Sequence, residues 1–281
     1  MKSLGRSLDV EVSAGVAWVT IDHPPLNLMD EQLIREIEAL PRTVEANDDV
    51  RVAVLGSADP DFFICHVDAT RILLEPAGEL PNDRALGRFH RMIEAFRQSP
   101  TIWIGLLEGR ARGGGAELLA ALDMRFGSLE SAVIEQPEVA TGLIPGGGGS
   151  TLLPGIVGRG RALEIILGCH DIDAAWAEQI GFLNRALPSE QIRAHVRALA
   201  ERIASFPAIA VALAKQAVGH ADELPRISAL LREEALFHEA LASPLAKDRL
   251  EQFLDGGGQT RAIELDLADY VATLNLPRSQ Q

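Results

Sequence analysis

The run from Thr101 to Leu107 constrains the fold more than any other part of this chain. It reads Thr-Ile-Trp-Ile-Gly-Leu-Leu and is nearly all apolar, which is typical of a strand buried on both faces of a largely parallel sheet. Gly113-Gly114-Gly115 follows a few residues later, and a helical pattern then covers Ala116 to Leu122. A buried strand, a glycine turn and a helix in this order predict an α/β core.

Strand-like and helix-like segments alternate through the first half of the chain. We expect strands at 8–12, 16–21 and 51–55, with a hairpin turn at 13–15, and helices at 30–40 and 84–97. Asp30 can cap the first helix, and Pro41 is expected to kink or end it. After about residue 155 the strand signal fades and helical patterns dominate. We therefore expect an α/β core over residues 1–205 and a helical C-terminal region over 206–281.

Composition and charge exclude several classes of function. The 281 residues carry 26 Lys+Arg against 40 Asp+Glu, a net charge of −14, which argues against a nucleic-acid partner. No apolar run reaches the ~18 residues of a membrane helix, and the N-terminus lacks the apolar core of a signal peptide. Cys65 and Cys169 are too few for a disulfide framework. These features predict a cytoplasmic protein without a membrane or nucleic-acid partner.

Familiar motifs for nucleophilic-serine, nucleotide and metal chemistry are missing from the sequence. There is no GxSxG, GxxxxGK[ST] or HExxH motif, and the seven histidines show no ligand spacing. Neither glycine cluster, 113–115 or 146–149, matches GxGxxG. We therefore expect no metal site.

The glycine turn at 113–115 is a candidate anion site. Unpartnered N–H groups at a helix start can stabilise a carbonyl oxygen that becomes an oxyanion, although a tight packing turn would explain the glycines equally well. Glu117 could simply complement the helix dipole, and Glu138 could be an ordinary surface carboxylate. Two carboxylates near one anion-binding turn would instead suit general acid–base work on an activated carbonyl compound.

Five motifs, taken in order, resemble the crotonase (enoyl-CoA hydratase/isomerase) superfamily over residues 8–255. The glycine turn lies in Glu108-Gly-Arg-Ala-Arg-Gly-Gly-Gly-Ala-Glu117, which is similar to the family pattern N-G-x-A-x-G-G-G-x-E. The other matching segments are Phe63–Asp68, Gln136–Glu138 with Gly142–Gly149, Gly168–Ile172 and Ala174–Leu187. The resemblance implies a spiral of ββα turns with a helical C-terminal trimerisation region.

The resemblance also implies roles for particular residues. The backbone N–H groups of Cys65 and Gly114 would form an oxyanion hole for the thioester carbonyl of an acyl-CoA. Glu117 and Glu138 would hold and activate a water that adds at the β carbon, and Glu138 would deliver a proton to the α carbon. The residues implied to contact the substrate are Cys65, His66, Val67, Asp68, Gly113, Gly114, Pro137 and Gly142.

Several positions depart from the family pattern. His66 stands where the family prefers glycine, and it could be either a packed residue or a proton donor beside the thioester. Arg110 and Arg112 flank the oxyanion turn, and Glu108 replaces an asparagine. The interval from Glu117 to Glu138 is one residue longer than usual. The C-terminal segment lacks the basic residues that often meet CoA phosphates, for which the candidate replacements are Arg71, Arg84 and Arg88.

The sequence therefore predicts an enoyl-CoA hydratase whose substrate carries coenzyme A, with no separate cofactor. An enoyl-CoA isomerase, a hydrolase or lyase using the same enolate, and a non-catalytic CoA-binding protein remain alternatives. We expect a homo-oligomer, either a trimer or a dimer of trimers. The apolar helices at 208–218 and 227–241 suit subunit contacts and internal packing equally well. Acyl-chain length is left open, and the loop at 73–83 is expected to influence it.

Overall fold

The computed structural model describes residues 2–3, 5–74, 86–257, 259 and 273–274. The chain divides into two compact units, residues 1–200 and 201–281. Most of the loop expected to influence acyl-chain length, and Arg84, lie outside the described residues. The second unit holds helices α9 (Ala208–Glu223), α10 (Arg226–Leu241) and α11 (Pro244–Asp255).

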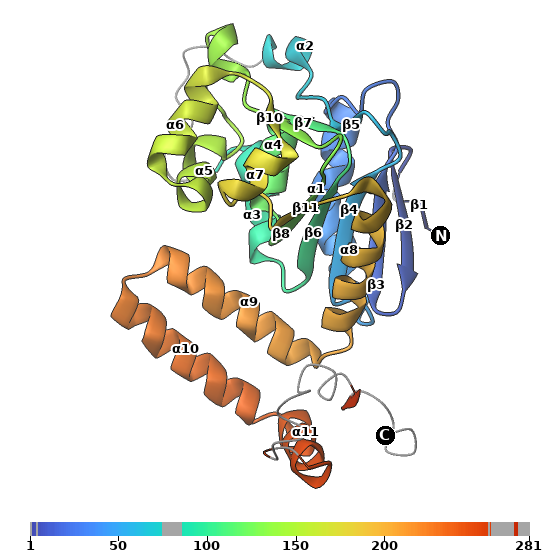
Figure 1. The fold of residues 1–281 in the computed structure, drawn as a ribbon, viewed down its shortest axis with the longest axis vertical. Coiled ribbons are helices and arrows are strands. Elements are labelled where there is room, and N and C mark those ends of the chain that lie inside the picture. Colours follow the sequence, from blue (N-terminus) through green and yellow to red (C-terminus); the bar gives the residue numbers. More distant parts are fainter. Residues whose placement is uncertain (1, 4, 75–85, 258, 260–272, 275–281) are drawn as a thin grey trace. The chain divides into compact units, whose positions relative to one another are not determined.

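A seven-stranded sheet forms the larger layer of the first unit (Figure 1). Its strands, in spatial order, are β1 (Lys2–Ser3), β2 (Leu8–Ser13), β3 (Val16–Ile21), β4 (Val52–Ser57), β6 (Ile102–Leu107), β8 (Met124–Ser128) and β11 (Arg185–Leu187). The first three strands are antiparallel, and the pairings from β3 to β11 are parallel. Every residue of β6 is buried, which confirms the predicted central strand. The β2–β3 hairpin is also confirmed, with positive φ at Ala14 and Gly15.

A second, four-stranded sheet runs in the order β10, β9, β7, β5. Its strands are β5 (Phe62–Ile64), β7 (Arg110–Arg112), β9 (Val133–Glu135) and β10 (Ile172–Asp173). Three successive pairs, β4–β5, β6–β7 and β8–β9, each place one strand in the large sheet and the next in the small sheet, and each is followed by helix. This repetition is the predicted ββα spiral. Because β5, β7 and β9 are parallel, the segments that follow them leave the same edge of the sheet.

Helices alternate with these strands along the chain, and the last of them extends past residue 200, where the first unit ends. They are α1 (Glu31–Glu45), α2 (Ala69–Ile72), α3 (Arg88–Gln98), α4 (Gly114–Ala121), α5 (Gly149–Val157), α6 (Arg159–Gly168), α7 (Ala174–Gln179) and α8 (Ser189–Ala204), with a 3₁₀ turn η1 at Glu138–Thr141. The expectation that Pro41 ends α1 is wrong, because the helix continues to Glu45. Pro41 and Val44 are buried on the apolar side of α1 and continue its packing beyond the proline. Two strands, β10 and β11, lie beyond residue 155, where the sequence predicted mainly helix.

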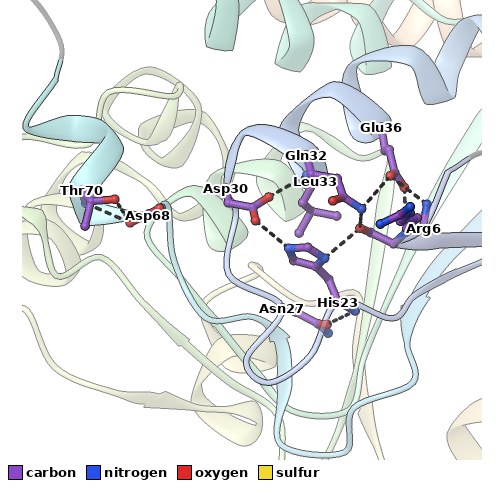
Figure 2. A network of polar contacts seen from close by, with 10 residues as sticks. Arg6, His23, Asn27, Asp30, Gln32, Leu33, Glu36, Asp68 and Thr70 are labelled. Carbon is purple, nitrogen blue, oxygen red and sulfur yellow. Dashed lines mark hydrogen bonds and ion pairs between the residues drawn. The ribbon is translucent and has the colours of Figure 1, made fainter.

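A polar network fixes the start of α1 (Figure 2). Asp30 accepts a hydrogen bond from the Leu33 N–H at 2.9 Å and contacts His23 Nε2 at 2.9 Å, and His23 Nδ1 lies 2.8 Å from Ser7 Oγ. The neighbouring residue, Met29, pairs with Val67 as an isolated parallel bridge. The network therefore anchors both α1 and the segment that follows β5. Among the described residues, no helix is long and apolar enough to cross a membrane.

Candidate active site

The segment after β5 and the glycine turn after β7 lie against each other. A Cβ on Gly115 would lie 2.7 Å from the Ile64 carbonyl oxygen, and one on Gly114 would lie 2.5 Å from Val67 Cγ2. A side chain at Gly115 would therefore collide with backbone, and one at Gly114 would force the Val67 side chain to move. Close packing thus requires the glycines, as one interpretation of the sequence proposed. The turn is also the start of α4, where the N–H of Gly114 has no acceptor within the helix, so the packing and anion-binding interpretations are compatible.

Glu117 is buried beneath the glycine turn, with 3% of its surface exposed. Its Oε1 accepts hydrogen bonds from the N–H groups of Gly147, at 2.7 Å, and Gly149, at 2.9 Å. Burial raises the pKa of Glu117, and the two backbone N–H groups and the charge of His90 partly oppose that rise. The two hydrogen bonds to Oε1 therefore fix the carboxylate, and Oε2 takes part in neither of them.

Glu138 begins η1 and approaches the glycine turn from the other side. Gly113 has a positive φ of 49°, and a Cβ there would lie 2.9 Å from Glu138 Oε1. When the Gln136 amide is assigned with its nitrogen toward Glu138, that nitrogen donates to the two carboxylate oxygens at 3.0 and 3.1 Å. Partial burial, and then the charges of Glu117 and Glu135, raise the pKa of Glu138 to about 7. At neutral pH this carboxyl group is divided between its two protonation states.

The structure brings most of the predicted residues together. Glu138, His66 and Gly113 meet at one point, because a Cβ on Gly113, which Glu138 approaches, would lie 3.8 Å from the Cβ of His66. Cys65 lies beside this cluster with 8% of its surface exposed, and burial raises the pKa of its thiol. Pro137 directly precedes η1, which begins at Glu138.

Two of the residues predicted to contact the substrate, Asp68 and Gly142, have local structural roles. The Asp68 carboxylate accepts hydrogen bonds from the N–H and the hydroxyl of Thr70, so it caps α2 (Figure 2). Gly142 ends η1 with a φ of 81°, and no atom lies within 4 Å of the place where its Cβ would be. Of the candidate basic residues, Arg71 and Arg88 both form ion pairs with Glu31 on α1.

Sequence reasoning missed the contribution of Phe89. Its ring lies 3.2 Å from a Cβ built on Gly114 and 2.2 Å from one built on Gly147, so it packs against both glycine segments. A lone aromatic residue on an amphipathic helix gives no signal of such a place. The roles of Gly147 and Gly149 as donors to Glu117 were also missed. Their signal was present, since both belong to the glycine run at 146–149.

The arrangement places two unlike carboxyl groups around one glycine turn. The Glu117 carboxylate is fixed by backbone donors, and its negative charge contributes to the raised pKa of Glu138. Burial raises the pKa of both groups, and carboxyl groups whose pKa is moved toward neutral pH are suited to acid–base chemistry. The N–H of Gly114, which has no acceptor within α4, suits an anionic intermediate beside them.

Comparisons with known proteins show which family the chain resembles. The family model described as enoyl-CoA hydratase/isomerase matches residues 11–257. A protein of Rhizobium meliloti named "Probable enoyl-CoA hydratase" is 32% identical, covering 89% of this chain and 95% of its own length. The "Short-chain-enoyl-CoA hydratase" of Clostridium acetobutylicum is 29% identical, with coverages of 88% and 94%.

Solved structures share the fold. An enoyl-CoA hydratase structure from Geobacillus kaustophilus superimposes with a TM-score of 0.83 at 28% identity and covers 92% of this chain and 98% of that one. DspI of Pseudomonas aeruginosa gives a TM-score of 0.80 at 28% identity, with coverages of 89% and 94%. The family model spans both the ββα spiral and the glycine turn with its two glutamates. The chain therefore belongs to the enoyl-CoA hydratase/isomerase family of the crotonase superfamily.

Proposed function

We propose that the protein is an enoyl-CoA hydratase, which adds water across the 2,3 double bond of an enoyl-CoA thioester. The observation that carries the proposal is the approach of two carboxyl groups with different environments to one glycine turn. Glu117 is held by two backbone N–H groups, and Glu138 has a pKa of about 7. Hydration needs both a carboxylate that activates water and a group that supplies a proton.

In the proposed reaction the thioester oxygen accepts hydrogen bonds from the backbone N–H groups of Cys65 and Gly114. Glu117 orients a water molecule and accepts one of its protons as the water oxygen bonds to the β carbon. The electron pair of the double bond moves toward the thioester, where the two N–H groups stabilise the enolate. Glu138 then gives its proton to the α carbon, which completes the 3-hydroxyacyl-CoA, and solvent restores both carboxyl groups.

The first experiment follows the loss of the conjugated enoyl-thioester absorbance when the protein is mixed with crotonyl-CoA. This short substrate is chosen because one relative is named a short-chain enoyl-CoA hydratase. We expect Glu117→Gln and Glu138→Gln each to lower kcat by about 10²- to 10⁴-fold, the usual contribution of a positioned acid or base. Glu178→Gln, at an exposed position on α7, is the matched control. Full activity in either active-site variant would contradict the assignment.

An enoyl-CoA isomerase is the second candidate, and the state of Glu138 favours it. A carboxyl group close to half-protonated at neutral pH can remove a proton at one carbon and return it at another without a second carboxylate. When the protein is given a 3-enoyl-CoA in place of crotonyl-CoA, an isomerase would convert it into the conjugated 2-enoyl-CoA. The enoyl-thioester absorbance would then rise instead of falling. Hydrolase or lyase activity would release different products, and binding without any turnover would identify a non-catalytic CoA-binding protein.

A further inference from the structure

An arginine stands between the two turns that carry the proposed chemistry. Arg112 ends β7 directly before Gly113, and Glu135 ends β9 directly before Gln136. The two residues are partners in the parallel register of these strands. One residue beyond the end of β7, the Gly113 N–H donates to the Glu135 carbonyl oxygen at 3.0 Å. The glycine turn and the segment leading to Glu138 are thus joined at this point.

The Arg112 side chain binds two carboxylates. Its Nε lies 2.5 Å from Glu135 Oε2, and its Nη2 lies 2.7 and 2.8 Å from the two oxygens of Asp171. Arg112 and Glu135 keep only 24% and 16% of their side-chain surfaces exposed, whereas Asp171 keeps 49%. A guanidinium group can hold two carboxylates because its donors form a rigid planar fork. The pair with Glu135 is the more buried contact.

Charges of this cluster reach the proposed catalytic groups. The groups that face Glu138 are Glu117 from α4, Glu135 from β9, Gln136, and His66 from the segment after β5. The charge of Glu135 contributes to the raised pKa of Glu138. The positive charge of Arg112 acts in the opposite sense to burial on the pKa of the Cys65 thiol. The Arg112–Glu135 pair therefore borders both sides of the site, because the charge of Arg112 acts on Cys65 and that of Glu135 acts on Glu138.

We propose that Arg112 is a positioning residue, which ties the Glu138 segment to the glycine turn and, by pairing with Glu135, limits the negative charge that Glu138 experiences. The proposal rests on the proposed role of Glu138 as the proton donor. An ordinary surface ion pair would affect stability alone, usually by about 1 kcal/mol or less. A pair that sets the charge around Glu138 also changes the pH at which Glu138 titrates.

The two partners have opposite effects in this scheme. Burial raises the pKa of Glu135, and the charge of Arg112 opposes that rise. Without Arg112, Glu135 and Glu138 are neighbouring carboxyl groups with no cation between them, so the coupled pair holds its protons to higher pH. Without the Glu135 charge, Glu138 loses a repulsive neighbour, so Glu138 releases its proton at lower pH. A purely structural role gives no reason for shifts of opposite sign.

The test compares Arg112→Met, Glu135→Gln, the double variant and Arg112→Lys. The ¹³C carboxyl resonance of Glu138, assigned by its absence in Glu138→Gln, is followed against pH, and kcat and KM for crotonyl-CoA are measured in parallel. We expect the titration midpoint to rise in Arg112→Met and fall in Glu135→Gln, each by about half a unit or more, with the double variant between them. Because Arg112 holds the Glu138 segment in place, we also expect Arg112→Met to lower kcat about tenfold, with a smaller change in KM.

Arg112→Lys separates charge from geometry, because lysine keeps the charge and lacks the fork. The Arg112→Lys variant should keep the titration midpoint of Glu138 near the wild-type value. Its kcat should be lower than that of wild type, as in Arg112→Met. Arg193→Met is the matched control, since Arg193 forms an ion pair with Glu108 through a mostly exposed side chain. Equal or same-sign midpoint shifts in Arg112→Met and Glu135→Gln would overturn the proposal. The NMR titration does not need turnover, so it remains decisive even where the wild-type protein fails to hydrate crotonyl-CoA.

Discussion

At Cys65, the residue after β5, the role of the backbone N–H can be separated from any role of the thiol. The thiol is buried, and burial raises its pKa, so it is neutral near pH 7. A neutral thiol is a poor nucleophile, whereas the backbone N–H is present with any side chain. We expect Cys65→Ala to keep kcat/KM for crotonyl-CoA within about threefold of wild type, with Cys169→Ala as the control. A loss of about 100-fold or more would assign chemistry to the thiol itself.

Glu138 should reduce the stability of the fold wherever it is ionised. Its folded-state pKa of about 7 lies above the ordinary value of 4.5, so the folded protein binds this proton more tightly than the unfolded chain. The stability that the folded protein gains from binding this proton is fully present below pH 4.5 and is lost as the pH rises through about 7. Thermal unfolding should therefore show Glu138→Gln gaining stability relative to wild type between about pH 5 and pH 8. A stability difference between Glu138→Gln and wild type that does not change with pH would contradict this.

The residues of the site were predictable to different degrees. Glu117 and Glu138 could be named because they follow glycine-rich or proline-containing motifs in a recognisable order. Their unequal environments could not be predicted, because the donors to Glu117 come from a turn 30 residues away. The ring of Phe89 reaches the site through tertiary packing alone, and no local pattern in the sequence records that contact.

At the scale of elements, the start of α1 depends on the Asp30 cap. Hydrogen bonds from Leu33 and His23 lower the pKa of Asp30, although burial opposes them. The cap therefore stabilises the fold above the ordinary pKa of 3.8, and its contribution is lost as the pH falls through the lowered value. We expect Asp30→Ala to reduce the free energy of unfolding at pH 7 by about 1 kcal/mol, measured by urea denaturation.

Asp30→Ser is the matched variant for this prediction. Serine can still accept the hydrogen bond from the Leu33 N–H but carries no charge opposite His23. We expect its loss of stability to be smaller than that of Asp30→Ala. If both variants lose the same amount, the contact with His23, and not the cap, is what stabilises this end of α1.

Long elements were predictable and short ones were not. The seven residues of the apolar run before the glycine turn suffice to identify a buried strand, and β6 confirms it. Strands β10 and β11 have two and three residues, too few to show alternation between buried and exposed positions. They form because neighbouring strands offer hydrogen-bonding edges, which is a property of the assembled sheets. Pro41 likewise fits inside α1 because the core covers it.

At the scale of the whole molecule, the repetition of ββα turns explains why distant motifs meet. Each turn sends a short strand into the small sheet, and the parallel strands β5, β7 and β9 end at one edge. The residues that follow them are Cys65, the glycine turn and the Glu138 segment. The order of motifs in the sequence thus becomes proximity in space. The family resemblance supplied this topology, since propensity alone does not define which strand enters which sheet.

The second unit carries the last prediction, which concerns assembly. Four large apolar side chains of α10, Ile227, Leu230, Leu231 and Phe237, are between 52% and 65% exposed in the described part of the chain. Internal packing among the described residues therefore does not cover them, and exposed apolar surface of this kind marks interaction sites. We expect the 30.3 kDa chain to form a trimer or a dimer of trimers, measured by light scattering after size exclusion.

The assembly prediction is tested by charge placed on this helix. Leu231→Glu combined with Phe237→Glu puts two carboxylates where apolar contacts are expected, so the apparent mass should fall toward that of one chain at low protein concentration. Arg232→Glu, at an exposed polar position on the same helix, adds the same kind of charge and is expected to leave the oligomer intact. A wild-type protein of single-chain mass at every concentration would contradict the prediction, and loss of the oligomer in Arg232→Glu would point to a general effect of charge, not to a specific apolar contact.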